Sequence, residues 1–432
     1  MRLCLVASKP TDAVTYGFLP AAERLGLEVF LLTDQPEAHE GALAQAAAVT
    51  AEWPAGTGPA GERALAGSVP GIAGRGLARN VPGIVPCDVH DTRSLIGRIA
   101  GLPAMDAVFT NSDHLQMQVA LAADYFGRPG KDWRSALRAK NKPLMRHRLA
   151  LTGAEKVAVA EITADGDGPP PGLPYPVVLK PAEGVASEDV ALVETPGALA
   201  ERCAEYFGRC PGGRLLAEEY LPGTLRTLET LGDGQRMWVF GGFRTTLSPL
   251  PYFIEERLTW EPLPPGGELD HVRRALDDLG TSFGPCHTEF TCDGSGGARL
   301  IEVNDRLIGD HDEFLMAELL DDDLFERVLR VHLGERLPAG PPPVGPGHAV
   351  ADYVIAERPG ILRTAPPGGP LDGAEPGVSL GYWPLRQPGD QVTVTHSNRD
   401  YLGVITGSGP GRTTVERSIR AARAACRWDI GS

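Results

Sequence analysis

The sequence lacks the cysteine patterns that mark zinc sites and disulfide frameworks. Its seven cysteines are an odd number, and no two of them are spaced as Cys-x-x-Cys. It also lacks an uninterrupted run of about 18 apolar residues, and the segment Met1–Ser8 has no signal-peptide pattern. These absences predict a chain with no membrane span in a reducing compartment, so we expect a cytoplasmic protein.

Positive charge is scarce as well. The chain has 41 Lys and Arg residues against 56 Asp and Glu residues, which gives a net charge of −15. A nucleic-acid backbone requires a basic face, so the charge argues against nucleic acid as the main partner. A local pair of lysines can still bind phosphate groups within an acidic chain.

Two familiar phosphate-binding motifs are missing. No Gly-x-Gly-x-x-Gly follows the first predicted strand, so the opening segment need not bind a dinucleotide. A Walker loop with its closing Gly-Lys-Ser/Thr is absent too. Any nucleotide site must therefore be built from other residues.

The order of predicted elements indicates an α/β (α+β) protein of about three domains. Strands at Arg2–Ala7 and Leu27–Leu32 flank a helix at Ala21–Leu25, a spacing typical of a parallel, Rossmann-like sheet. Beyond the proline-rich segment Pro338–Pro346, short predicted strands and a helix at Thr414–Cys426 indicate a small β-rich domain. The expected domains are residues 1–128, 129–336 and 347–432.

One segment of the first domain has an unusual composition. Residues 54–86 are rich in Gly, Ala and Pro. We expect a long insertion or loop there, and a substrate lid is an alternative interpretation.

The segment Ala298–Arg306 concentrates polar side chains on one face of a predicted strand. Side chains alternate along a strand, so Glu302, Asn304 and Arg306 point to one side. A second predicted strand carries Glu289, and the Asp-Gly-Ser-Gly-Gly sequence between the two strands predicts a hairpin turn.

Such a hairpin can place Glu289 and Glu302 side by side, with the amide of Asn304 next to them. Two carboxylates and one carbonyl oxygen are hard ligands that suit Mg²⁺ shared with phosphate oxygens. Arg306 offers a planar fork for a carboxylate or a phosphate. The plain alternative is an amphipathic hairpin with a solvated polar face.

Two further features favour a phosphate-binding cleft. Lys180 ends a continuous apolar strand, where its charge must emerge into a cleft or be paired. A loop of small residues, 183–190, follows at once and can fold over phosphates with its N–H groups. The strand Leu215–Leu221 then runs into a turn whose backbone can bind the edge of an adenine.

Taken in this order, the segments resemble the ATP-grasp superfamily, over roughly residues 130–335. The layout of the whole chain is similar to that of bacterial L-amino-acid ligases and biotin carboxylase. The resemblance implies that Lys142 and Lys180 bind the phosphates and that Glu289, Glu302 and Asn304 bind the metal. It implies a catalytic role for Arg306, Glu289 and Glu302. The remaining nucleotide contacts that it implies are Ala186, Ser187, Glu218, Glu219, Tyr220, Leu221 and Glu229.

The chain departs from the superfamily pattern in three places. Gly223-Thr-Leu225 stands where Gly-x-Glu is frequent, which leaves the ribose contact open between Arg226 and Glu229. Val-Ala stands in the small-residue loop where a second glycine is common, which predicts a stiffer loop. Asn141 replaces a frequent Asp before the first lysine.

The resemblance implies an enzyme, an ADP-forming carbon–nitrogen ligase. It would use ATP with one or two Mg²⁺ ions, or Mn²⁺ in their place, to activate a small carboxylate as an acyl phosphate and join it to an amine. The carboxylate is expected to be an amino acid or a small organic acid, in specialised metabolism and peptide-bond formation, and a homodimer is expected from similar proteins.

Further substrate contacts and two other functions remain open from the sequence. We expect Glu255 and Glu256 to grip the amine or act as a base, with a charged loop as the alternative. His311 is a substrate candidate, with a surface histidine as the alternative. The other functions are carboxylation of the biotin-carboxylase kind and ATP binding by a sensor without turnover.

Overall fold

The structure is a computed structural model that describes residues 1–52, 83–166, 172–294, 296–320, 322–344 and 347–431. Within these ranges the chain forms a parallel four-stranded sheet, an antiparallel four-stranded sheet, a ten-stranded sheet and a three-stranded sheet. None of the described helices is both long enough and apolar enough to span a bilayer.

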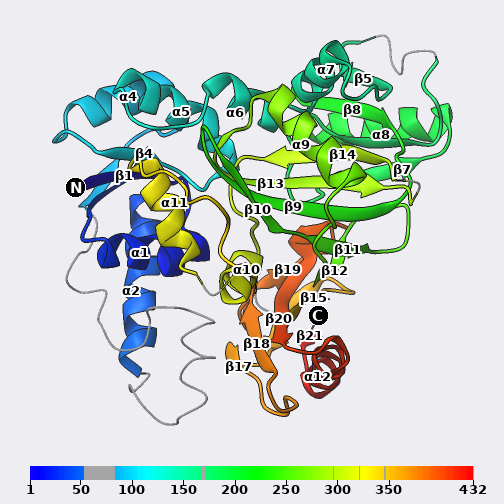
Figure 1. Ribbon diagram of the computed structural model, residues 1–432. Coiled ribbons are helices and arrows are strands. Elements are labelled where there is room, and N and C mark those ends of the chain that lie inside the picture. Colours follow the sequence, from blue (N-terminus) through cyan, green and yellow to red (C-terminus); the bar gives the residue numbers. More distant parts are fainter. Residues whose placement is uncertain (53–82, 167–171, 295, 321, 345–346, 432) are drawn as a thin grey trace.

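The chain begins with the parallel sheet, in the order β3-β2-β1-β4 (Figure 1). Its strands are β1 (Arg2–Val6), β2 (Glu28–Thr33), β3 (Gly83–Pro86) and β4 (Ala107–Phe109). The helical segments around it are η1 (Ala13–Phe18), α1 (Leu19–Arg24), α2 (Pro36–Glu52), α4 (Thr92–Ala100), η3 (Asp113–Leu115) and α5 (Gln116–Tyr125). The predicted α/β opening is confirmed, and the apolar side chains of β1 are buried on both faces, as helices on both sides require.

Two helices lead from this layer to the second sheet. They are α6 (Trp133–Lys140) and α7 (Lys142–Thr152). The second sheet has the order β5-β8-β6-β7, with strands β5 (Val159–Thr163), β6 (Val177–Pro181), β7 (Ala191–Val193) and β8 (Arg214–Glu219). One face of this sheet packs on α8 (Pro196–Arg209) through Leu179, Leu199 and Leu215. Side chains alternate along a strand, so Lys180 belongs to the other face.

The large sheet has the order β14-β13-β9-β11-β12-β15-β20-β18-β17, and β10 pairs with β9. Its first strands are β9 (Thr224–Asp233), β10 (Met237–Gly241), β11 (Phe243–Leu247), β12 (Glu255–Trp260), β13 (Phe283–Cys292) and β14 (Ala298–Asn304). The helix α9 (Gly267–Leu279) packs with α7 against β13 and β14, where Met145, Leu276 and Phe290 form a buried core. The antiparallel pairing of β13 with β14 is the predicted hairpin.

The rest of the chain extends the same sheet. The elements are α10 (Asp312–Leu320), α11 (Leu324–His332), β15 (His348–Ile355), β16 (Gly360–Thr364), β17 (Gly369–Pro370), β18 (Ser379–Pro384), β19 (Gln391–Val392), η4 (Asn398–Asp400), β20 (Tyr401–Gly409), α12 (Arg412–Ala425) and β21 (Asp429–Gly431). The C-terminal region is β-rich, as predicted, but β15 pairs with β12, so the sheet runs on across the expected boundary at 347. The strands β19, β16 and β21 form the small sheet.

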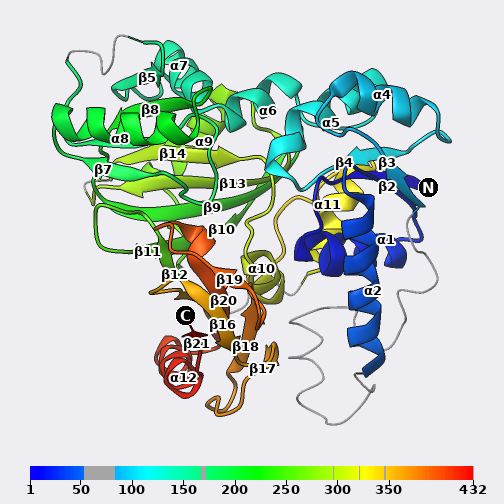
Figure 2. The same cartoon turned by 180° about the vertical axis from the view of Figure 1, so that it is seen from behind.

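The helix α11 lies far from the first layer in sequence but beside α1 and β4 in space (Figures 1 and 2). Its Phe325 ring meets Phe18 edge-on at 5.1 Å between centroids. At its end, His332 packs against Phe109 at 4.7 Å. The carboxylates of Asp323 and Glu326 bind Arg24. This contact joins the first layer to the large sheet and sets where the loops after β4 lie.

The composition-based expectation for residues 54–86 has a mixed outcome. Gly83–Pro86 is not loop but the strand β3, which pairs with β2 in parallel register. The expectation was wrong there because four residues with a terminal proline give too short a pattern to identify an edge strand. Residues 54–82 lie outside the described part of the chain.

Candidate active site

The hairpin of β13 and β14 brings the predicted metal ligands into two neighbouring rows. Glu289 stands opposite Glu302, and His287 stands opposite Asn304. The adjacent strand β9 pairs with β13, so that Glu229 lies opposite His287. Because paired residues of an antiparallel sheet share a face, these side chains point to the same side. The two predicted metal carboxylates are therefore direct neighbours.

Two buried ion pairs connect one of these carboxylates, Glu289, through His287 to Glu229. The Nδ1 of His287 lies 2.8 Å from an oxygen of Glu229, and its Nε2 lies 3.4 Å from an oxygen of Glu289. Burial opposes protonation of His287, but the two carboxylates outweigh it and raise the pKa of His287 to about 10. Burial acts against ionisation of Glu289 too, yet His287 and then Lys142 lower its pKa.

This arrangement bears on the role predicted for Glu229. Its side chain is buried within the sheet and pairs with His287. That position favours holding the imidazolium in place over contacting a ribose. Arg226, the other ribose candidate, instead donates a hydrogen bond to the carbonyl of Glu261.

The first predicted phosphate lysine, Lys142, begins the helix α7 just after its cap. The side chain of Asn141 accepts a hydrogen bond from the N–H of Leu144, the usual way to satisfy a free helix N-terminus. The Nζ of Lys142 lies 2.8 Å from Glu302 and donates to the carbonyl of Gly184 at 3.3 Å. Burial opposes the charge of Lys142, but Glu302 and then Glu289 outweigh it and raise the lysine's pKa.

The second phosphate lysine, Lys180, meets a buried carboxylate from the hinge strand. Its Nζ lies 2.5 Å from Glu218, which also accepts a 2.8 Å hydrogen bond from Arg146. Burial favours the neutral acid, yet Lys180 and Arg146 outweigh it and lower the pKa of Glu218 to about 2. For Lys180 itself, burial prevails over the attraction of Glu218 and lowers the pKa.

The small-residue loop lies between the two lysines and is held at several points. Ala186 and Ser187 have φ angles of 56° and 54°, in the left-handed region that non-glycine residues rarely adopt. The carbonyl of Ala186 accepts a hydrogen bond from the N–H of Asn398 at 2.9 Å. The Arg399 side chain binds Glu188 at 3.0 Å. The loop is thus strained and anchored, in line with the stiffness predicted from its missing glycine.

The hinge segment after β8 is partly committed to protein contacts. The N–H of Glu219 donates to the carbonyl of Ala158 at 2.9 Å, and that of Tyr220 donates to the carbonyl of Pro176 at 3.1 Å. An adenine contact of the predicted kind therefore falls to the Glu219 carbonyl and the Leu221 N–H. Both residues are partly exposed.

Arg306 projects from the end of β14 toward loops of the first layer. Its Nε lies 3.3 Å from Asp113 of η3. The side chain of Asn111 accepts a hydrogen bond from the next N–H, that of Leu307, at 3.2 Å. Burial opposes its charge, but Asp113 and other carboxylates raise the pKa of Arg306. The first layer therefore forms one wall of the site at the predicted arginine.

Beyond Arg306 the structure gathers a group of carboxyls that we call the carboxyl pocket: Glu255, Asp310, Asp312 and Glu313. Asp312 accepts a 2.7 Å hydrogen bond from Tyr353, and Asn398 donates to Glu255 at 3.0 Å. Burial, with Glu289 and Asp310, raises the pKa of Glu255. Burial also raises the pKa of Asp312, and it raises that of Glu313 to about 7.

The other two substrate candidates have different surroundings. His311 is only 5% exposed and stacks on Trp383 at 5.0 Å, so the alternative of a surface histidine is wrong. Its Nε2 lies 2.8 Å from Asp12. Glu256 follows Glu255 on the same strand, where the pairing with β11 shifts register. Of the two neighbouring glutamates, Glu255 is the one whose pKa Glu289 and Asp310 help to raise.

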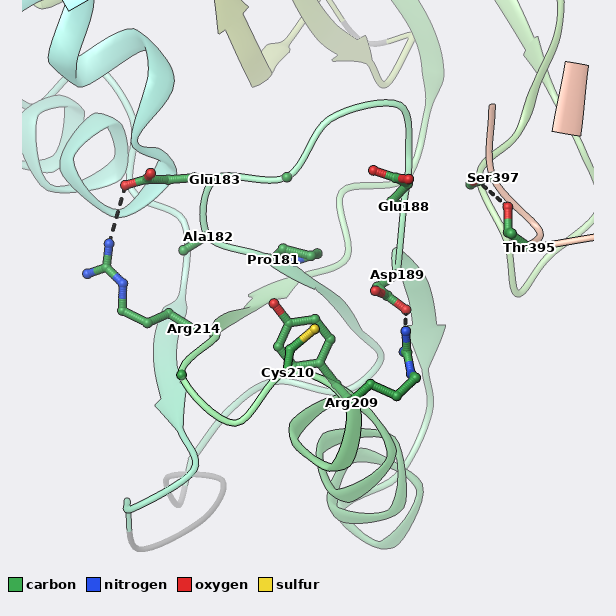
Figure 3. Close-up of a pocket in the computed structure, with 13 residues that line it drawn as sticks. Pro181, Ala182, Glu183, Glu188, Asp189, Arg209, Cys210, Arg214, Thr395 and Ser397 are labelled. Carbon is green, nitrogen blue, oxygen red and sulfur yellow. Dashed lines mark hydrogen bonds and ion pairs between the residues drawn. The ribbon is translucent and has the colours of Figure 1, made fainter. Parts of the chain in front are cut away.

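A cavity of about 690 Å³ lies against the outer side of the small-residue loop (Figure 3). Its walls include the ion pairs of Glu183 with Arg214 and of Asp189 with Arg209. The turn at Thr395 and Ser397 closes another side. The two predicted phosphate lysines and the predicted metal carboxylates do not line this cavity.

Sequence reasoning missed several residues of the site. They are Asn111, Asp113, Arg146, His287 as a support of Glu289, Asp310, Asp312, Glu313 and Asn398. Most come from segments remote in sequence, which no local pattern connects. One signal was available: the run Asp310-His-Asp-Glu313 follows Arg306 closely, and its last two acidic residues open a helix that is mostly apolar.

The donor set fits a magnesium ion better than a transition metal. Within the described ranges no group of three or more His, Cys, Asp or Glu side chains is arranged to hold a metal alone. Glu289, Glu302 and Asn304 supply two carboxylates and an amide, which suits an ion that completes its shell with phosphate oxygens and water.

The fold is similar to those of several solved structures. The L-amino acid ligase from Bacillus licheniformis matches over 100% of this chain and 99% of its own, with a TM-score of 0.71 and 19% identity. The phosphoribosylglycinamide synthetase from Anaerococcus prevotii matches over 100% and 99%, with a TM-score of 0.64 and 12% identity. Biotin carboxylase from Campylobacter jejuni matches over 99% and 92%, with a TM-score of 0.63 and 15% identity. The chain has the ATP-grasp fold.

The match with the Bacillus ligase extends over essentially the whole of both chains. No protein-family model matches the sequence. The uncharacterized protein y4rH of Sinorhizobium fredii is 29% identical over 311 residues, which are 69% of this chain. The matched part spans 60% of y4rH.

Proposed function

We propose that this chain is an ATP-dependent ligase that activates a small carboxylate as an acyl phosphate and joins it to an amine. The observation that carries the proposal is the convergence of Lys142 and Lys180 with Glu302 and Glu218 between two sheets. A solvated hairpin face would leave Glu302 in water, but its side chain is only 18% exposed and binds a buried lysine. Two neighbours with this fold, named an L-amino acid ligase and a phosphoribosylglycinamide synthetase, support the same reaction class.

ATP would lie between the antiparallel four-stranded sheet and the large sheet. Its phosphates would compete with Glu302 and Glu218 for the two lysines, and the loop 183–190 would cover them. The backbone after β8 would bind the adenine. Glu289, Glu302 and Asn304 would hold one or two Mg²⁺ ions, which neutralise charge on the phosphoryl group as it transfers.

The reaction then needs two group transfers. An oxygen of the substrate carboxylate attacks the γ-phosphorus, and the bond to the leaving ADP breaks. The amine nitrogen next attacks the acyl carbon, phosphate leaves, and the amine gives up a proton. Arg306 would hold the carboxylate and its acyl phosphate, and Glu255, with its raised pKa, would accept the proton.

The direct experiment is a screen for ADP release. The full chain is incubated with MgATP and with pairs of acids and amines drawn from amino acids and small organic acids. The masses of the products are then measured by mass spectrometry. We expect ADP release only when both partners are present, with a condensed product lighter by one water than their sum. ADP release that depends on bicarbonate would instead indicate carboxylation. ATP binding without ADP release under any condition would indicate a sensor.

A further inference from the structure

The carboxyl pocket holds more acid than its protein neighbours can neutralise. Asp312 and Glu313 are buried, Glu255 is half-buried, and Asp310 is exposed next to them. Among the described residues, the cation within this run is His311, which is already paired with Asp12 at 2.8 Å. Arg306, whose pKa Asp310 helps to raise, is already paired with Asp113. Buried carboxyls without a counter-charge are costly, so a protein retains them where protonation or a ligand compensates.

One atom shows that the pocket is incomplete. Asp312 is 1% exposed, and its Oδ2 accepts the hydrogen bond from Tyr353. Its Oδ1 is buried and has no hydrogen-bond partner among the described residues, and the same is true of an oxygen of Glu313. Native proteins satisfy nearly all buried polar atoms, so these oxygens indicate a missing donor.

These carboxyls adjoin the predicted metal ligands. Glu255 feels the charges of Glu289 on the metal edge and of Asp310, so it connects the two regions. On the far side, the stacked rings of Tyr353 and Tyr401, 4.2 Å apart, back the pocket, and Tyr401 donates a hydrogen bond to the Glu255 carbonyl. An amine that donates its proton to Glu255 would place the rest of its chain toward Asp310 and Asp312.

We propose that the amine substrate carries a second ammonium group and that Asp310 and Asp312 bind it. The inference rests on the proposed ligase function for the first, reacting amine. The ligand that the proposal describes is a primary diamine whose two amino groups are separated by a short alkyl chain. Either a simple diamine or a basic amino acid supplies that chemistry, so the test includes one pair of probes for each source.

The test measures binding by calorimetry to the full chain saturated with MgADP. The probes are 1,4-diaminobutane with 1-aminobutane, and L-lysine with L-norleucine, pairs that differ by the second ammonium. We expect one diamino probe to bind about tenfold or more tightly than its partner, since a charge-assisted pair to a buried carboxylate is among the strong hydrogen bonds. Equal or absent binding within both pairs would overturn the proposal.

Variants locate the effect. Asp312→Asn keeps an acceptor for Tyr353, and Asp310→Asn keeps a residue that tolerates the observed φ of 55°. Each should reduce the preference for the diamino probe to about threefold or less, whereas Asp277→Asn, on the exposed side of α9, should leave it unchanged. A preference that survives both pocket variants would contradict the assignment. Binding needs no turnover, so a chain that binds a diamine but never releases ADP refutes the proposed function alone.

Discussion

At the scale of single residues, the site is built from buried ion pairs whose members have separate tasks. Glu218 binds Lys180 and Arg146, and Arg146 also reaches the carbonyl of Leu300 at 2.8 Å. Removal of Lys180 leaves Glu218 with one cation, so the fold should tolerate it. The nucleotide would lose a phosphate partner.

Lys180→Ala should therefore weaken ATP binding by about tenfold or more while the thermal midpoint changes little. Calorimetric titration with ATP measures the first quantity and a melting curve the second. Lys156→Ala, an exposed lysine just before β5, is the control. Wild-type affinity in the Lys180 variant would argue against the cleft.

His287 leads to a different prediction, because its ring contacts the predicted metal ligand Glu289. Groups that orient metal ligands typically change metal affinity by about 10–100-fold. His287→Asn should raise the Mg²⁺ concentration needed for half-maximal ADP release by about tenfold, and the milder Glu229→Gln should raise it less. If His287→Asn lowers the melting temperature but leaves the Mg²⁺ dependence unchanged, the role of His287 is structural only.

At the scale of elements, the sequence predicted strands that are continuously apolar or whose polar and apolar residues alternate, and it missed a strand with another spacing. In β14, Glu302 and Asn304 alternate with Val303 and reveal the strand. In β9 the leucines at 225, 228 and 231 are three apart, which resembles a helix more than a strand. The strand sits between neighbours in the large sheet, where threonines as well as leucines are buried. Its pairing partners, remote in sequence, decide its conformation.

The helix α11 offers a test of how the first layer is attached. A Cβ added at Gly17 in η1 would lie 2.3 Å from the ring of Phe325, which is itself buried. Gly17→Ala should thus destabilise the fold by about 1–3 kcal/mol. Gly41→Ala in α2, where nothing lies within 4 Å, should stabilise it by about 0.5–1 kcal/mol. Denaturant unfolding measures both, and equal effects would contradict this account of the docking.

At the scale of the whole molecule, the fold class and the phosphate-and-metal face follow from local patterns, whereas the substrate side does not. Lys180, Glu289, Glu302 and Asn304 stand on strands whose register the sequence suggests. The wall at Asp113 comes from the first layer, and Asn398 comes from the last third of the chain. Asp113 and Asn398 come close to the site only because of the way the sheets pack, and no single segment of the sequence indicates that packing.

This contrast between local patterns and the packing of the sheets explains why the reaction class is better supported than the identity of the substrates. Both lysines and the metal edge lie within two lobes that the resemblance covers. The carboxyl pocket combines β12, the start of α10 and the turn at η4, and each segment alone reads as an ordinary charged surface. Only the assembled molecule shows that these acids gather at one place.

The most direct test of the central claim is ADP release by Glu302→Ala in the presence of MgATP and a productive acid–amine pair. Glu302 lies opposite Glu289 and binds Lys142, so its loss should abolish substrate-dependent ADP release, by about a thousandfold or more, in a protein that still melts cooperatively. Glu194→Ala, on an exposed carboxylate after β7, should release ADP at the parental rate. Unchanged ADP release by Glu302→Ala would contradict the assignment of this hairpin as the metal edge of an ATP site.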